Sequence, residues 1–586
     1  MERNTLEKFF TGKNFVIPKY QRDYAWTREN IDDLLDDIAE TIETQTSHYI
    51  GTFILSRRPG EDTYFVVDGQ QRLTTLTMLL NAIVGLLPSD QQIINRDKFI
   101  QDAKKKRWRL ELADHNRKFL EGLLQGSDAK PESKSQKLLH DAYEYIKQYV
   151  GAKRAGGDGK LEAYLEGVNQ LEVMEFIETD EGKAIRIFQT VNDRGRPLTI
   201  VEKTKALLIY YSNRFLSSRQ DGMINEAFGK IFRNFLALKE IANAEHTRIG
   251  LLSQASFTED SVMRYHFLSF RNGYYDYKPT MDYVLNVFLK GTLRDCQKKH
   301  GERDLESFII RYVSDLEKFF ASLLELTKQV ESNPRYFKLF CVLGLSTHLY
   351  PLTIRLHGRG LLDSAVGKTG LTFADLIEIT DIRVYKIRGT NPAKDISHLA
   401  CDVGEKQPIE LSERLRNIVS NFMDDGRFAS DLSGSMYGNE ALLHMLLQYG
   451  EENALKQRGS AGYTVAVLQQ FMSSQPTIEH IFAQSCPILS FPSHGFGKKE
   501  EYESQINRLG NLCLLEKSLN SRCQDKTPEQ KLDDAKLYKG SSFDVTKALV
   551  AETASSGCEF NAKAVEDRTK KLSQFIILRW PLWARR

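Results

Sequence analysis

The first two hundred residues alternate short apolar runs with longer stretches of helical periodicity. Residues 14–18, 49–56 and 64–68 are short runs rich in β-branched and aromatic residues, which predicts strands. Residues 31–43 and 73–87 instead carry apolar residues at helical spacing, which predicts helices. Together these elements predict a small α/β unit.

Two further segments extend this unit. Residues 171–178 predict another strand, and residues 186–211 predict two helices separated by a turn at 192–197. We place the end of the first domain near residue 220, so the first predicted domain covers residues 1–220.

The middle of the chain has a helical pattern. Aromatic and leucine residues recur three and four apart in residues 221–430, most clearly at 308–326 and 336–349. A stretch rich in Gly, Ser and Asp at 424–438 predicts a surface connection into a third domain, residues 431–586. The expected fold class is α+β multidomain, mostly helical, with a helical connector between the two ends.

The third domain opens with a β-like run that ends in Glu479 and His480. An apolar run at 512–515 predicts a second strand, and residues 527–537, which begin with Thr-Pro, predict a helix. The expected order is therefore strand, strand, helix.

Composition changes this picture little. The chain has 586 residues, 41% of them apolar, and a formal net charge of +2, so two to four domains are expected. With so little net charge, any nucleic-acid surface has to be a local patch. The seven cysteines include no CxxC pair, which argues against a zinc knuckle or a disulfide framework.

The N-terminal residues and the apolar runs indicate where the protein is located. The N-terminal residues lack the apolar stretch of a signal peptide, and the longest membrane candidate, residues 73–87, is too short to span a bilayer. We therefore expect a soluble protein of the reducing cytoplasm, with no membrane partner.

The polar residues around the two predicted C-terminal strands suggest phosphodiester hydrolysis. His480 is the candidate general base, because an imidazole titrates near working pH. Glu479 and Asn520 offer oxygen ligands suited to a divalent metal such as Mg²⁺ or Mn²⁺, and Asn511 is expected to orient the loop or the imidazole. The alternative is a Glu-His pair that only caps or solvates an element end, which is the commoner role of an isolated pair.

A second polar cluster lies where a predicted strand meets a helix near the N-terminus. This cluster consists of Asp68, Gly69, Gln70, Gln71 and Arg72, with Gln21 and Arg22 in an earlier motif. Free backbone N–H groups at a helix start, a glycine and two arginines make a plausible phosphate cradle, although no Walker motif is present. A turn followed by a helix cap is the alternative interpretation.

The C-terminal motifs resemble a known family. Residues 478–481, 509–512 and 519–521 look like the nuclease half of the GmrSD family of type IV, modification-dependent restriction enzymes. This resemblance implies a His-Me finger, also called a ββα-metal or HNH-like nuclease. The family often has a proline three residues after the histidine, whereas this chain has Ala483.

The N-terminal motifs resemble the other half of the same family. Residues 17–26, 67–75 and 188–205 look like its nucleotide-binding half, whose fold is of the ParB and sulfiredoxin type. The resemblance implies binding and hydrolysis of a nucleoside triphosphate. It places Asp68, Gln71 and Arg72 in the nucleotide site, with Gln21, Arg22, Asn192 and Arg194 nearby.

The function implied by the resemblance is that of a fused, single-chain type IV restriction enzyme. Such an enzyme would cut double-stranded phage DNA whose cytosines carry hydroxymethyl or glucosyl groups. Its cleavage would be metal-dependent and regulated by a nucleoside triphosphate, through a homodimer that rearranges with nucleotide. The alternative is a non-cleaving, nucleotide-gated DNA-binding sensor or a pure NTPase switch.

Overall fold

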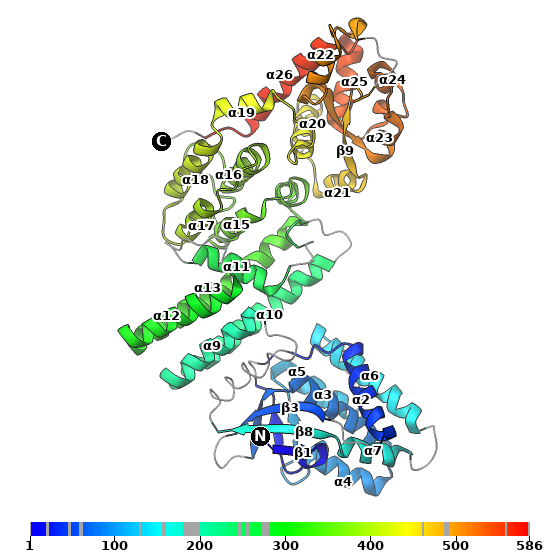
Figure 1. The fold of residues 1–586 in the computed structure, drawn as a ribbon, viewed down its shortest axis with the longest axis vertical. Coiled ribbons are helices and arrows are strands. Elements are labelled where there is room, and N and C mark those ends of the chain that lie inside the picture. The colour runs from blue at the N-terminus through cyan, green and yellow to red at the C-terminus, as the bar shows by residue number, and fades with distance from the viewer. Residues whose placement is uncertain are drawn as a thin grey trace. The chain divides into compact units, whose positions relative to one another are not determined.

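The computed structural model describes most of the chain and divides into two compact units (Figure 1). Unit 1 comprises Met1–Phe232 and Leu285–Ser314, and unit 2 comprises Arg233–Val284 and Asp315–Arg586. The described residues are 2–18, 21, 23–44, 49–57, 62–127, 130–154, 160–179, 199–243, 249–252, 257–270, 280–459, 462–485, 491–556 and 559–583.

A six-stranded mixed sheet forms the centre of unit 1. Its strands lie in the order β1 (Glu2–Thr5), β8 (Glu172–Glu178), β3 (Tyr49–Ser56), β4 (Thr63–Asp68), β2 (Asn14–Val16) and β7 (Leu110–Glu111). β3 runs parallel to β8 and antiparallel to β4, and β2 runs parallel to both of its neighbours. A separate two-stranded pair consists of β5 (Gln101–Asp102) and β6 (Arg107–Trp108).

Helices pack around this sheet. They are α1 (Leu6–Phe10), α2 (Arg28–Thr44), α3 (Gln70–Val84), α4 (Ser89–Phe99), α5 (Asp114–Leu124), α6 (Lys134–Arg154) and α7 (Lys160–Asn169). Unit 1 also contains α9 (Ile200–Phe215), α12 (Lys290–Asp295) and the π-helix η3 (Cys296–His300). The helix α3 contacts α4, α6 and α7 and is buried along almost its whole length. Its central place explains why even its polar residues, such as Thr74, Thr75 and Asn81, are buried.

Unit 2 is mostly helical. Before its C-terminal hairpin it contains α11 (Glu259–Phe270), α14 (Pro334–Phe337), η4 (Lys338–Val342), η5 (Thr347–Leu349), α15 (Tyr350–Gly358), α16 (Phe373–Thr380), η6 (Asp381–Ile387), α17 (Ala393–Asp402), α18 (Pro408–Phe422), α19 (Asp425–Leu432), α20 (Leu442–Arg458) and α21 (Val465–Ser473). Three helices, α10 (Asp221–Asn243), the π-helix η2 (Tyr283–Leu289) and α13 (Glu302–Val330), run across a boundary between the units.

The C-terminal part of unit 2 surrounds that hairpin. Its elements are β9 (Pro476–His480), η7 (Pro492–His494), α22 (Lys499–Gln505), η8 (Leu509–Asn511), β10 (Leu512–Glu516), α23 (Lys517–Cys523), α24 (Pro528–Asp533), η9 (Tyr538–Gly540), α25 (Asp544–Ser556) and α26 (Ala562–Arg579). β9 and β10 are antiparallel and adjoin a small core that includes Phe482, Cys513 and Tyr538.

A buried polar network joins the predicted connector to the last helix of unit 2. The carboxylate of Glu378 lies 2.7 Å from the ring of His444 and accepts a hydrogen bond from the indole of Trp580 at 2.9 Å. Arg383 donates to the carbonyl of Trp580 and to the carboxylate of Asp425. The predicted boundary at residue 430 thus falls inside one compact unit.

The structure confirms the mostly helical class and the N-terminal α/β region. The predicted strands at 49–56 and 64–68 correspond to β3 and β4, and the helices predicted at 31–43 and 73–87 correspond to α2 and α3. For the segment 186–211, the first predicted helix and the turn lie outside the described residues, whereas α9 accounts for the second helix.

Of three local predictions, the first was wrong and the other two were confirmed only in part. The surface connection predicted at 424–438 contains the helix α19, because Asp424 caps its start by accepting from the backbone N–H of Arg427. The helical stretch 336–349 is broken into α14, the π-helix η4 and the 3-10 turn η5. The helix predicted at 527–537 ends at Asp533, and the unpredicted helix α23 precedes it.

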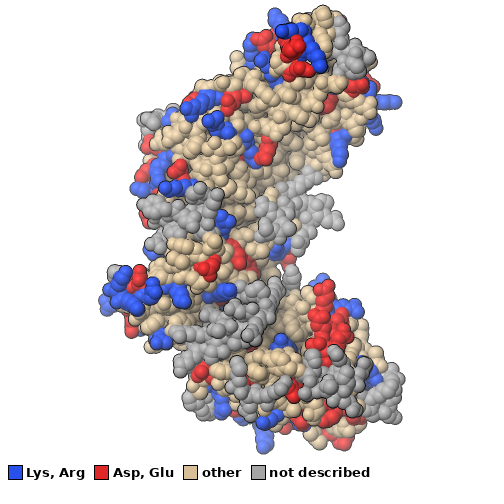
Figure 2. Space-filling model, viewed as in Figure 1, with Lys and Arg blue, Asp and Glu red and all other residues tan. Residues whose placement is uncertain are grey.

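The distribution of charge matches the small net charge. Figure 2 shows lysine and arginine as well as aspartate and glutamate on the visible face, including one mainly acidic and one mainly basic cluster, without one dominating basic surface in this view. Of the described helices, none combines the length and the apolar character needed to cross a lipid bilayer.

Candidate functional site

The hairpin and the helix after it carry the four C-terminal residues singled out in the sequence. Glu479 and His480 end β9, Asn511 ends the 3-10 turn before β10, and Asn520 lies on α23. Leu512 pairs with His480 across the hairpin. Asn520 therefore lies on a helix that was not predicted from the sequence.

His480 contacts one residue before the hairpin and one in the long connection between its two strands. Its Nε2 lies 3.0 Å from Oδ1 of Asn507, and its ring packs on Tyr437 with 4.2 Å between the ring centroids. Because an amide oxygen only accepts hydrogen bonds, Nε2 carries the proton and Nδ1 keeps the lone pair in the neutral ring. Burial lowers the pKa of His480, and the bond to Asn507 partly opposes that shift.

Glu479 faces a buried lysine. Lys531 Nζ donates to Glu479 Oε1 and to the backbone carbonyl of His480, both at 2.7 Å. Burial raises the pKa of Glu479, and the charge of Lys531 opposes this rise. Side chains alternate along a strand, so Glu479 shares its face with Thr477, whereas His480 ends the strand.

Asn511 and Asn520 tie the hairpin to its surroundings. Asn511 Oδ1 accepts from the backbone N–H of Phe482 at 2.7 Å, and its Nδ2 donates to the carbonyls of Phe482 and Ile506. Asn520 Nδ2 donates to Thr477 Oγ1 at 2.8 Å, which places the carboxamide on the Glu479 face of the hairpin. The amide of Asn511 thus fixes the loop that follows His480.

Gly510 lets the turn before β10 lie directly on the last helix. A Cβ at this position would fall 1.8 Å from the carbonyl oxygen of Val565 and 2.6 Å from Oγ1 of Thr569. The backbone N–H of Gly510 donates to that hydroxyl at 2.9 Å, and Arg568 donates to the carbonyl of Gly510. The close contact with α26 therefore sets the position of Asn511 and of the loop after His480.

In unit 1, the junction of β4 and α3 holds the second predicted cluster. Asp68 ends β4 and Gln70 begins α3, with Gly69 between them at φ +93°. A Cβ on Gly69 would lie 2.4 Å from the ring of Phe53, so conformation and space both require glycine here. Glycine has no side chain to cap α3, which leaves its first backbone N–H groups to other acceptors.

Two glutamines, one in each motif, join this cluster to the preceding motif. Gln71 Oε1 accepts from the backbone N–H of Ala25 at 2.7 Å, and Gln71 Nε2 donates to the carbonyl of Asp23 at 3.1 Å. Gln21 Nε2 donates to the carbonyl of Val67 at 2.7 Å. These hydrogen bonds join two motifs that are about fifty residues apart in the sequence, at the end of β4.

Arg72 lies half-buried against the sheet. Its guanidinium is centred 5.7 Å from the ring centroid of Phe53, and Nη1 lies 2.4 Å from where a Cβ on Gly51 would be. Burial lowers the pKa of Arg72, and the charge of Asp68 opposes that shift. Gly51 is thus the residue that makes room for this side chain.

A buried lysine from α9 belongs to the same region. Lys205 is 4% exposed, and burial lowers its pKa to about 7 against the opposing charges of Glu202 and Asp23. Asp23 also accepts a hydrogen bond from Asn116. The third predicted motif therefore reaches the segment that Gln71 binds. Three residues predicted for this site, Arg22, Asn192 and Arg194, lie outside the described residues.

Both ends of the chain match models of one protein family. The model of the GmrSD restriction endonuclease N-terminal domain matches residues 6–209, and the model of the GmrSD C-terminal domain matches residues 422–575. Together the two matches cover more than half of the chain. The chain belongs to the GmrSD restriction endonuclease family. No curated protein matches it.

Membership fixes the broad activity. A GmrSD restriction endonuclease is a DNA endonuclease of phage defence, and this chain carries both GmrSD domains in sequence. All C-terminal residues singled out above lie within the second match, and those of the β4–α3 junction lie within the first.

The GmrSD C-terminal segment offers a small set of oxygen donors for a metal ion. Glu479 and Asn520 supply a carboxylate and a carboxamide on one face of the hairpin, the hard donors that Mg²⁺ prefers. The ammonium of Lys531 already bonds to Glu479, so this carboxylate holds a cation in the present arrangement. Within the described residues, no three His, Cys, Asp or Glu side chains converge as a metal cluster.

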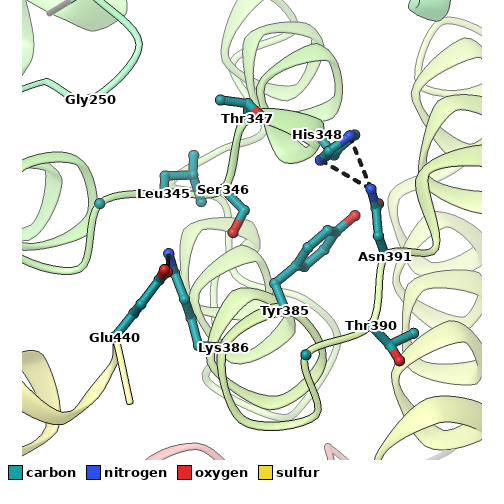
Figure 3. A pocket seen from close by; sticks show the side chains of 12 residues that line it. Gly250, Leu345, Ser346, Thr347, His348, Tyr385, Lys386, Thr390, Asn391 and Glu440 are labelled. Atoms are coloured by element: carbon teal, nitrogen blue, oxygen red, sulfur yellow. Dashed lines mark hydrogen bonds and ion pairs between the residues drawn. The ribbon is translucent and has the colours of Figure 1, made fainter. Parts of the chain in front are cut away.

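A separate polar pocket of about 400 Å³ lies in the helical part of unit 2 (Figure 3). Its lining includes Ser346, His348, Tyr385 and Asn391, and Lys386 pairs there with Glu440 at 2.7 Å. Asn391 donates to the ring of His348, as the dashed lines in Figure 3 show. None of the lining residues belongs to either predicted site.

Four residues that contact the candidate site residues or lie close to them were not predicted from the sequence. They are Lys531, Asn507, Tyr437 and Lys205. Each acts on a residue distant in sequence, so no local spacing marks its role. Only Lys205 lay in a recognised motif, and a lysine within an otherwise apolar helical face was the available signal there.

Proposed function

We propose that this chain is a metal-dependent, nucleotide-regulated DNA endonuclease of the type IV class. Its substrate would be phage DNA with hydroxymethylated or glucosylated cytosines. The observation that supports the cleavage chemistry best is the placement of His480, whose Nε2 is bonded to Asn507 while Nδ1 keeps its lone pair. The hairpin with α23 would form a His-Me finger.

In the proposed reaction, His480 Nδ1 takes a proton from water. The water oxygen forms a bond to phosphorus as the bond from phosphorus to the leaving sugar oxygen breaks. Asn507 holds the ring, and Asn511 holds the loop after it. A Mg²⁺ or Mn²⁺ ion held by Glu479 and Asn520 would neutralise the charge that develops on the phosphate oxygens.

A nucleoside triphosphate would bind at the β4–α3 junction of unit 1. Gly69 permits a close backbone approach, the start of α3 offers N–H groups, and Arg72 supplies positive charge beside Asp68. We also propose that the region has a ParB/sulfiredoxin-like fold. Nucleotide can regulate cleavage only if it binds two arrangements with different affinity, for which a rearranging homodimer is our proposal.

The test is cleavage by the purified chain of matched phage DNAs. These carry unmodified, hydroxymethylated or glucosylated cytosine, and each is incubated with Mg²⁺ or Mn²⁺ and with each nucleoside triphosphate in turn. We expect cutting of modified DNA that stops on addition of a chelator. Hydrolysis of nucleotide without any cutting would identify an NTPase switch and contradict the proposal.

Asn507→Leu is expected to slow cleavage by about 10- to 100-fold, the range typical of partners that orient an active group. The neutral imidazole is the base, so the wild-type rate falls as pH drops through the lowered pKa of His480. Loss of the Asn507 bond lowers this pKa further and moves the acid limb to lower pH. Plasmid cleavage across about pH 5 to 8 measures both effects.

The matched control is Asn421→Leu, which replaces an exposed asparagine on α18 in the same unit. It is expected to leave the rate and the acid limb unchanged. An Asn507→Leu profile identical to that of the wild type would show that Asn507 does not act on the base.

Arg72→Ala and Asp68→Ala are expected to weaken nucleotide binding. Loss of one charged hydrogen bond costs about 1.5–3 kcal/mol, or roughly 10- to 100-fold in affinity. Binding of a fluorescent nucleotide measures the change, and Arg28→Ala on the exposed face of α2 is the control. Unchanged binding and turnover in both variants would discard this pocket.

A further inference from the structure

Lys531 is a fully buried lysine whose place is set by the short helix α24. Thr527 caps this helix, with a reciprocal bond from Gln530, and Pro528 occupies its first turn. The Lys531 side chain is 0% exposed. A buried ammonium needs charged or polar partners, because its desolvation is otherwise uncompensated.

Both partners of Lys531 belong to one dipeptide. The ammonium donates to the Glu479 carboxylate and to the His480 carbonyl, each at 2.7 Å. One group therefore fixes the side chain of the proposed metal ligand and the backbone of the proposed base. A shift of α24 would move both of them.

Buried neighbours strengthen the contact between Lys531 and Glu479. Buried Cys513, Cys523 and Tyr538 lie close enough to interact electrostatically with Glu479. In this apolar setting water screens the attraction between Lys531 and Glu479 only weakly. The two hydrogen bonds that Lys531 donates are therefore held firmly in one direction. Well-packed apolar residues often stabilise a fold as well as a buried ion pair does. Stability alone therefore gives no reason for a lysine and a glutamate at these two buried positions.

We propose that Lys531 is a positioning residue of the nuclease site, one that holds the Glu479 side chain in place and the end of β9 in register. This proposal rests on the proposed function, because it assigns the two held residues to cleavage. Lys531 touches neither substrate nor metal in this role. It acts through Glu479 and through the backbone of His480.

The first measurement does not depend on activity. Mn²⁺ binding is measured by electron paramagnetic resonance in a His480→Ala background, with and without Lys531→Met. We expect Lys531→Met to weaken Mn²⁺ binding by about tenfold or more, as is typical when a group that orients a metal ligand is lost. Equal or tighter Mn²⁺ binding would overturn the proposal, because it would make Lys531 a bystander or a competitor of the ion.

The second measurement is cleavage with an otherwise intact site. Lys531→Met is expected to lower kcat by about 10- to 100-fold with little change in the KM for DNA. In Lys531→Ala, added ethylamine should restore part of the rate by returning an ammonium to the space. The control Lys539→Met removes a half-exposed lysine paired with Asp533 and should leave kcat unchanged.

Two outcomes separate folding from positioning. If Lys531→Met unfolds, the double variant Glu479→Gln/Lys531→Met removes both buried charges, and it should fold while still binding Mn²⁺ weakly. A folded Lys531→Met that cuts at the wild-type rate contradicts the role of Lys531 alone. Absence of cutting by the wild type under every condition contradicts the proposed function instead.

Discussion

Replacing His480 with alanine is expected to lower the rate of DNA cleavage by about 10³-fold, within the range that a general base contributes. The imidazole takes part in a hydrogen bond with the Asn507 side chain and in a ring contact with Tyr437, neither of which involves the strand pairing, so the hairpin should keep its backbone bonds. Nucleotide binding should remain at the wild-type level, because the proposed nucleotide site lies in unit 1. Single-turnover cleavage of modified DNA measures the loss.

Two further variants make this result specific. In His480→Gly, added imidazole should restore part of the cleavage, because a free ring can occupy the vacated space and take the proton. His140→Ala, on the part-exposed surface of α6, is the matched histidine control and should cut normally. Wild-type cutting by pure His480→Ala would remove the assigned base.

Gly510→Ala is expected to destabilise unit 2 by about 3 kcal/mol, the upper part of the usual range for an overpacked site. A methyl group 1.8 Å from the Val565 carbonyl cannot be accommodated without moving backbone, and no flexible side chain can yield there. The turn η8 would separate from α26, and Asn511 would lose its place on the loop after His480. Urea unfolding followed by circular dichroism measures the change, together with loss of cleavage.

Gly404→Ala provides the matched control for this prediction. Gly404 lies in the same unit, has no atom within 4 Å of an added Cβ and does not need a left-handed backbone. Its substitution should leave the unfolding transition within about 0.5 kcal/mol of the wild type. An equal effect of the two substitutions would show that the contact with α26 is unimportant.

The elements that could be predicted from the sequence are those whose signal is local. The strand at residues 49–56 has a run of β-branched and aromatic residues, and the structure forms β3 over the same residues. The helix α19 was missed because its Gly, Ser and Asp content suggested a loop, whereas Asp424 caps it and Phe428 and Leu432 bury one face. Composition alone does not reveal which polar residue acts as a cap.

The candidate nuclease residues were found because they cluster along the chain, and their partners were missed because they do not. Glu479 and His480 are adjacent in the sequence, but Lys531 is 52 residues from Glu479 and Asn507 is 27 from His480. Such pairings depend on how helices and turns pack around the hairpin. No periodicity encodes them.

The same limit applied in unit 1. The sequence suggested that Gln21 and Gln71 line a nucleotide site, but their side-chain amides hold backbone groups of neighbouring segments. An amide can bind a ligand or a peptide group equally well, so residue type does not decide between them. The assignment of these residues to a nucleotide site stays a prediction.

The carboxylate of Glu378, with its imidazole and indole donors, determines where this protein can be divided for separate expression. A fragment that starts at residue 431 would contain His444 and Trp580 without their shared acceptor, and both rings would face an empty core. A transplantable nuclease module would have to begin upstream of Glu378. Any exchange of the nuclease segment between related proteins would therefore have to include the part of the helical region that contains Glu378.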